Sequence, residues 1–158
     1  MRTISLNGML TSLSTNFNRR NKNVRLYELG NIYLPKQVPV TELPEERMQF
    51  TLGMYGEGDF FTMKGVIEEF LYKAGMKLKL EYDPEAGKPF LHPGRQANVV
   101  YDGTVIGYLG EVHPTVAANY AIKERVYVAV LDMPEIVSRA AFDHKYEGIA
   151  KFPAAARD

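Results

Sequence analysis

The chain has 158 residues, of which 46% are hydrophobic and 24% charged, an ordinary composition for a globular protein. The 19 basic and 19 acidic side chains cancel, and the lack of cysteine excludes disulfides, thiolate metal sites and cysteine nucleophiles. No apolar run approaches the ~20 residues that span a bilayer, and the start lacks the apolar core of a signal peptide. We therefore expect a cytoplasmic protein with no membrane partner.

The charges are unevenly distributed. Residues 1–27 carry five basic side chains and no acidic one, namely Arg2, Arg19, Arg20, Lys22 and Arg25. Such a segment can attract phosphates or an acidic partner. Cations are also favoured near the C-terminal end of a helix by the helix dipole, and a helical pattern precedes Arg19. We favour the dipole interpretation and keep the RNA-binding alternative open.

The first half of the chain predicts two helices and two strands. Residues 5–19 predict an amphipathic helix, because apolar side chains recur there at helical spacing: Leu6, Met9, Leu10, Leu13 and Phe17. Residues 24–34 predict a strand, in which Gly30 indicates a bulge or a close backbone approach. Residues 48–54 alternate as a half-buried strand. A second helix follows Asp59 as its N-cap and ends near Gly75.

The second half predicts four strands and two shorter helices. The strands are predicted at residues 78–82, 97–101, 104–112 and 125–131, and Asp102-Gly103 joins the middle two as a hairpin. Pro114 opens a helix that runs to Ala121, and Pro134 opens another near residues 135–140. Because hairpin strands alternate with helices, we expect an α+β fold with an antiparallel or mixed sheet flanked by helices.

The segment His92-Pro93-Gly94-Arg95 has two interpretations. It could present an imidazole and a guanidinium to a ligand. Pro and Gly also favour a tight turn, which the flanking side chains would anchor by hydrogen bonds. We favour the structural turn.

Glu111 and His113 also have two interpretations. Alternate residues share a strand face, so the two side chains could act as an acid/base pair in an enzyme. A strand end that leads into a helix at Pro114 explains them without chemistry. We favour the structural role. The three histidines lack metal-ligand spacing, and residues 107–110 lack the features of a phosphate loop. No catalytic, cofactor-binding or metal-binding residue is therefore predicted.

Several segments together resemble, in the same order, the bacterial phenylalanine–tRNA ligase beta subunit. Residues 1–10 resemble its M-R-T-S-L-x-x-G-L-L segment, and residues 24–30 resemble its V-R-L-F-E-I-G strand. Further blocks match at residues 60–65, 92–95, 106–114 and 151–153. The matching segments extend over nearly the whole chain.

The resemblance implies a catalytic-like module of the beta subunit. It implies that residues 1–150 form a degenerate class II synthetase domain, and that residues 151–158 lead into a missing anticodon-binding domain. In this family the phenylalanine and ATP site, with its magnesium, lies in the alpha subunit. Class II sites clamp ATP phosphates with arginines. Here the glycine-rich segment at residues 107–110 continues into Glu111 without such an arginine.

The resemblance also implies partners: an alpha subunit, in an alpha2beta2 heterotetramer, and tRNA through the parent complex. It implies that the first helix contacts the alpha subunit, which makes Ser12, Asn16, Arg19 and Arg20 the candidate interface residues. The expected role is that of a structural, subunit-assembling module without catalysis of its own. The alternative is a free-standing domain that binds RNA or protein through its basic N-terminal segment.

Overall fold

Six strands form one sheet in the computed structural model of the chain, which describes residues 1–142. They are β1 (Val24–Leu34), β2 (Glu45–Tyr55), β3 (Glu81–Asp83), β4 (Leu91–Tyr101), β5 (Thr104–Val112) and β6 (Val126–Asp132). Their order is β1-β2-β6-β5-β4-β3, and each neighbouring pair is antiparallel. The predicted antiparallel sheet is confirmed, without the parallel pair that a mixed sheet needs. The predicted boundary at residue 150 and the segment 151–158 lie outside the described residues.

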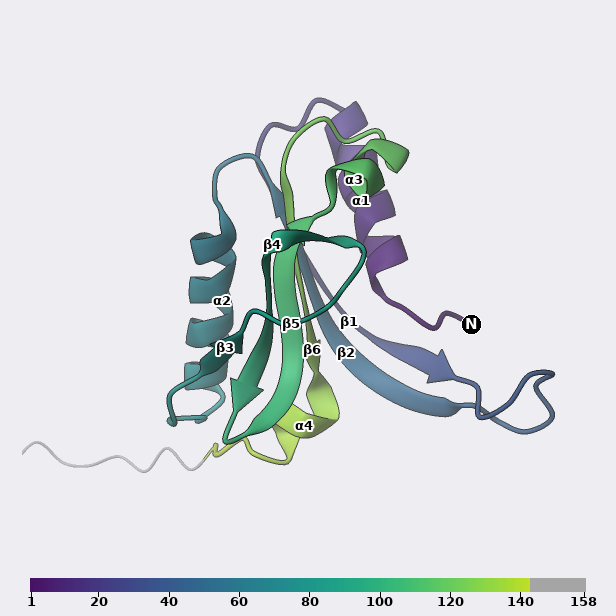
Figure 1. The fold of residues 1–158 in the computed structure, drawn as a ribbon, viewed down its shortest axis with the longest axis vertical. Helices are drawn as coiled ribbons and strands as arrows, with labels where there is room; N and C mark the ends of the chain where they lie inside the picture. Colours follow the sequence, from purple (N-terminus) through teal and green to yellow (C-terminus); the bar gives the residue numbers. More distant parts are fainter. Residues whose placement is uncertain (143–158) are drawn as a thin grey trace, which may run out of the picture.

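Helices cover both faces of this sheet (Figure 1). They are α1 (Leu6–Asn18), α2 (Phe60–Lys73), α3 (Pro114–Asn119) and α4 (Met133–Val137). The apolar sides of α1 and α3 pack on one face, and that of α2 packs on the other. Each face therefore has its own hydrophobic core, which burial of apolar surface stabilises.

The central strand β6 contributes to both cores. Its side chains alternate between the α1 face, with Val126, Val128 and Val130, and the α2 face, with Tyr127 and Leu131. These five side chains are at most 6% exposed. A strand covered on both faces needs an apolar side chain at nearly every position, which explains the continuous run in the sequence.

The first helix packs closely on the sheet, as its pattern predicts. Its side chains Leu6, Met9, Leu10 and Leu13 are at most 4% exposed. A Cβ atom on Gly53 of β2 would lie only 2.7 Å from the Met9 Cγ atom. The lack of a side chain at this glycine therefore sets how near α1 approaches the sheet.

The bulge predicted as one alternative at Gly30 is wrong, because β1 pairs with β2 in an unbroken register from Val24 to Leu34. The close approach at Gly30 is made by a side chain rather than by backbone. The Arg2 guanidinium crosses this glycine, donates to the Asn31 carbonyl at 3.1 Å and pairs with Glu28. Gly30 thus makes room for an arginine that ties the N-terminal segment to β1.

Local capping and turn signals are confirmed. The Asp59 carboxylate accepts from the Thr62 backbone N–H at 2.9 Å, and this bond caps α2. Gly75 has a φ of +80° just after the helix. Asp102 and Gly103 have φ values of +49° and +71°, as a type I′ hairpin turn requires.

Several predicted boundaries differ from the structure. The strand predicted at 78–82 is only Glu81–Asp83, the part that pairs with β4. The strand predicted at 97–101 begins earlier, at Leu91. The helix predicted at 135–140 is Met133–Val137, because the Asp132 carboxylate caps it directly after β6 by accepting from the Glu135 N–H at 3.3 Å.

Candidate functional site

The segment His92-Pro93-Gly94-Arg95 lies inside β4 as a large, irregular bulge. Leu91 pairs with Val112 and Gln96 pairs with Gly110, so four residues of β4 stand opposite the single Glu111. The predicted position, a tight turn before the strand, is therefore wrong. The predicted anchoring is present in the bulge, where His92 Nδ1 accepts from the Gly94 N–H at 3.1 Å and Arg95 contacts Glu111.

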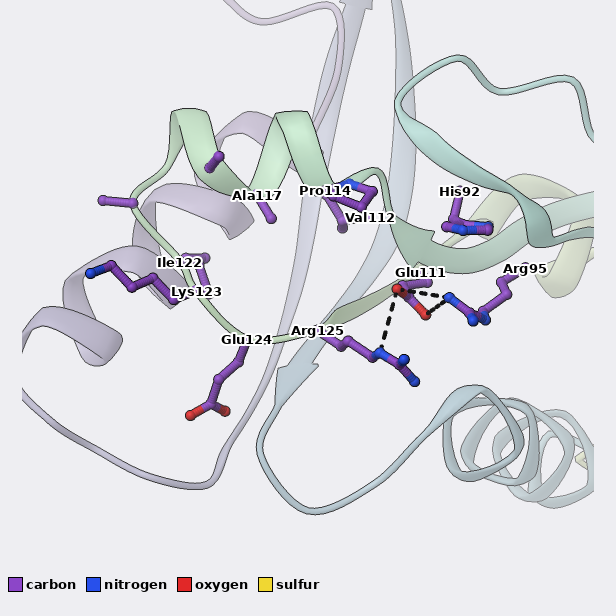
Figure 2. A pocket seen from close by; sticks show the side chains of 12 residues that line it. His92, Arg95, Glu111, Val112, Pro114, Ala117, Ile122, Lys123, Glu124 and Arg125 are labelled. Carbon is purple, nitrogen blue, oxygen red and sulfur yellow. Dashed lines mark hydrogen bonds and ion pairs between the residues drawn. The ribbon is translucent and has the colours of Figure 1, made fainter.

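Two arginines converge on the carboxylate of Glu111 (Figure 2). The Arg95 Nη1 atom lies 3.2 Å from Oε1 and 3.1 Å from Oε2 of Glu111. The Arg125 Nε atom lies 3.9 Å from Oε1. The Glu111 side chain is 4% exposed, whereas those of Arg95 and Arg125 are 41% and 66% exposed. Because a buried carboxylate loses its hydration, the guanidinium groups replace water as its partners.

The acid/base alternative for Glu111 and His113 requires that both residues lie on one face of the strand, and His113 lies outside it. Strand β5 ends at Val112, and His113 is the N-cap of α3, where its Nδ1 accepts from the Thr115 N–H at 3.2 Å. Within residues 1–142 no hydrogen bond or ion pair joins the two side chains. This geometry supports the structural interpretation of both residues.

The role of Arg125 was missed by the sequence reasoning. Arg125 precedes β6, and it reaches Glu111 only because β6 and β5 are neighbours with Glu111 opposite Tyr127. The one available signal was a lone acid at the end of an apolar strand, which needs a basic partner when buried. That signal does not say which arginine provides the charge.

Two cavities meet at these arginines. The larger, of about 650 Å³, extends from Arg95, Glu111 and Arg125 to α3 and the loop after it (Figure 2). The smaller, of about 390 Å³, lies between the arginines and the start of α2 and includes Phe60 and Phe61. Arg95 and Arg125 line both cavities. They therefore form a shared wall of two guanidinium groups.

The electrostatics of this wall do not fit ATP. Two guanidinium charges and the Glu111 carboxylate leave an excess of one positive charge, far from matching a triphosphate. Asp59 also lines the smaller cavity, and hydrogen bonds from the Thr62 backbone and side chain lower its pKa from the ordinary value. Its negative charge would oppose a polyanion. No cluster of three or more metal-binding side chains occurs within residues 1–142.

The four candidate interface residues lie along one flank of α1 and its end. Ser12, Arg19 and Arg20 are exposed, and Asn16 is partly buried. The Asn16 side chain donates to the Ser12 carbonyl at 2.9 Å. Arg19 is the C-cap of the helix, and Arg20 follows it with a φ of +62°. The structure thus brings Ser12, Asn16 and Arg19 together and places Arg20 just beyond the helix.

The five basic residues near the N-terminus do not form one patch. Arg2 is turned toward Glu28 on β1, and Arg25 donates to the Glu57 carbonyl at 3.3 Å. Arg19, Arg20 and Lys22 remain exposed at the end of α1. This division weakens the alternative of an RNA-binding domain that uses the whole segment, since phosphate affinity depends on several adjacent cations.

The sequence matches known proteins over its whole length. A family model described as the phenylalanyl tRNA synthetase beta chain CLM domain matches residues 1–133. The phenylalanine–tRNA ligase beta subunit of Clostridium acetobutylicum is 40% identical over 158 residues, and that of Clostridium tetani is 39% identical. That of Streptococcus thermophilus is 35% identical over 165 residues and matches 97% of this chain. The chain spans about a fifth of the length of these relatives.

The fold is also found in solved structures. Two structures of pyrrolysyl tRNA synthetase from Desulfitobacterium hafniense match 87% of the chain with a TM-score of 0.68, at 12% and 13% identity. The matched region makes up 49% and 48% of the lengths of those two chains. This likeness confirms the predicted α+β fold of class II synthetase type. No helix within residues 1–142 is long and apolar enough to cross a membrane. The family model and the relatives confirm the resemblance found in the sequence, and the chain belongs to the family of phenylalanyl tRNA synthetase beta chain CLM domains.

Proposed function

We propose that this domain is a non-catalytic, subunit-assembling module of a phenylalanine–tRNA ligase beta subunit. The parent complex would attach phenylalanine to its tRNA using ATP and magnesium, with two alpha and two beta chains. The names of the relatives support the parent activity. The saturation of Glu111 by two arginines supports a domain without chemistry of its own.

The outer face of α1 is the observation that carries the assembling role. Residues 3–18 contain no charged side chain, although this helix lies at the surface. The outward positions form one continuous face at helical spacing: Asn7, Gly8, Thr11, Ser12 and Thr15. Charged residues are depleted at the centre of protein interfaces, whereas an ordinary solvated helix face carries them.

Three polar side chains on and beside this face are already bonded within the helix. Thr11 Oγ1 donates to the Asn7 carbonyl at 2.8 Å, and Thr15 Oγ1 donates to the Thr11 carbonyl at 3.0 Å. Asn16 Nδ2 donates to the Ser12 carbonyl at 2.9 Å. Within residues 1–142 the Ser12 hydroxyl and the Asn7 side-chain amide donate no hydrogen bond, so a partner that covers the face has only these two groups left to pair. We infer that the alpha subunit packs here, with Arg19 and Arg20 at the rim.

Charge insertion tests the proposal. We expect the double substitution Thr11→Lys and Thr15→Lys, in a full-length beta subunit co-expressed with its alpha subunit, to weaken the complex at least about tenfold, or about 1.4 kcal/mol. Lysine is a good helix former, so the domain itself should stay folded. Light scattering after size exclusion measures the complex and its two-plus-two stoichiometry. The matched control is Tyr72→Lys on α2, a position that is 61% exposed on the opposite face of the sheet.

Hydrogen exchange gives an independent measurement without substitution. The amides of residues 6–18 should exchange more slowly when the alpha subunit is bound, whereas those of α2 should change little. Equal protection of α1 with and without a bound alpha subunit, together with a normal complex of the double variant, would show that this face is not the interface.

A further inference from the structure

The Arg95–Glu111–Arg125 cluster holds more donors than Glu111 uses. Both contacts from Arg95 to the carboxylate are made by Nη1, and Arg125 approaches it only through Nε at 3.9 Å. Each guanidinium has five N–H donors. The Nη2 atom of Arg95 and both Nη atoms of Arg125 have no hydrogen-bond partner within residues 1–142. Arg95, which contacts both oxygens of the buried Glu111, is held in place before any ligand arrives, whereas Arg125 contacts the same carboxylate only at 3.9 Å.

The charge at the cluster selects the kind of ligand. Arg95 and Arg125 contribute two positive charges and Glu111 one negative charge, so the Arg95–Glu111–Arg125 cluster by itself has an excess of one positive charge. The Asp59 carboxylate on the rim of the smaller cavity disfavours a dianion such as phosphate. Glu124 and Lys123 point away from the cluster (Figure 2). A carboxylate matches both this charge and the planar fork of a guanidinium.

The smaller cavity adds an apolar wall beside these donors. Phe60 and Phe61 lie edge to face with ring centroids 5.8 Å apart, and Phe61 is 72% exposed. Tyr127 lines the same cavity, and the Gln96 amide lies there with its Oε1 bound to the Lys88 N–H at 2.8 Å. A cavity that combines aromatic lining with a few unused donors is the arrangement expected of a small-molecule site. The cavity volume of about 390 Å³ fits one aromatic ring with its carboxylate.

We propose that Arg95 and Arg125 bind the carboxylate of a small apolar monocarboxylate, whose hydrophobic group packs on Phe60 and Phe61 in the smaller cavity. This site lies on the α2 face of the sheet, away from the outer face of α1. It is therefore independent of the subunit interface proposed above, and it can be tested without an alpha subunit.

Benzoate is the probe, and the 158-residue chain is titrated with it at constant ionic strength. The readout is the set of backbone and arginine side-chain signals in proton–nitrogen spectra. We expect saturable shifts centred on Gly94, Arg95, Gln96 and Arg125, with smaller shifts at Phe61. Benzamide has the same shape without the charge, and it should bind far more weakly. Should the chain aggregate, the same titration is made with the full-length beta subunit. Binding is then followed by saturation transfer from the protein to benzoate.

Variants locate the binding. Arg125→Gln should weaken benzoate binding by about tenfold, because charge-assisted hydrogen bonds contribute more than neutral ones. Phe61→Ala should weaken it too, whereas Arg19→Gln at the end of α1 is the control and should bind as the unsubstituted chain does. Equal binding of benzoate and benzamide, or unchanged binding by Arg125→Gln, would overturn the proposal.

Discussion

The two arginines at Glu111 should differ sharply in their effect on stability. Arg95 contacts both oxygens of the carboxylate at 3.1 and 3.2 Å, whereas Arg125 contacts one at 3.9 Å. We predict that Arg95→Met strongly destabilises the domain and that Arg125→Met hardly does. Methionine retains much of the apolar stem, so the comparison isolates the guanidinium group.

The magnitude follows from burial. Removing one partner of a buried ion pair costs about 3–5 kcal/mol, because a charge is left buried without compensation. Arg95 is 41% exposed and Arg125 remains nearby, so we take a reduced value of about 2–3 kcal/mol for Arg95→Met. An exposed pair contributes about 0–1 kcal/mol, which is the expected loss for Arg125→Met at 66% exposure. For a chain of this length the first loss lowers Tm by about 5–10 °C.

Urea unfolding followed by circular dichroism measures these free energies. Equal slopes of the unfolding free energy against urea concentration would show that the substitutions change stability alone. The double variant Arg95→Met with Glu111→Met should recover most of the loss, because well-packed apolar groups can replace a buried pair. The reasoning is refuted if Arg125→Met is the more damaging substitution, or if Arg95→Met stays within about 0.5 kcal/mol of the parent chain.

Two further predictions concern packing and pH. Gly53→Val should destabilise the fold by about 1–3 kcal/mol because its Cβ meets Met9 at 2.7 Å, while Gly65→Ala, with no atom within 4 Å of the new Cβ, should be neutral or stabilising in the same unfolding assay. Burial raises the pKa of Tyr108 to about 12 from its ordinary value of 10.0. The folded state therefore holds this proton more tightly, so its contribution to stability is complete below pH 10 and is lost as the pH rises toward about 12. Tyrosinate absorbance should show a late ionisation that Tyr108→Phe removes, and a titration unaltered by that substitution would contradict the assignment.

Several features of the protein were set by local sequence. The stripe of α1, the Asp59 cap of α2 and the Asp102-Gly103 turn depend on interactions within a few residues, and the structure has all three. The family is likewise decided by the ordered motifs, because it depends on residue identity alone. The uncharged run from Thr3 to Asn18 is visible in the sequence as well. That its outer half is exposed follows from the helical period and the apolar stripe on the inner half.

The tertiary structure decided what depends on strand order and register. Arg95 and Arg125 are 30 positions apart along the chain, and they meet at Glu111 only because β4, β5 and β6 are neighbours in the sheet. The bulge at residues 92–95 and the position of Arg2 over Gly30 also depend on which strand lies opposite. Local propensity fixes the period of a segment but not its partner. Partners are chosen by the joint burial of both sheet faces and by compensation of the buried Glu111 charge, and these act between residues far apart in the sequence.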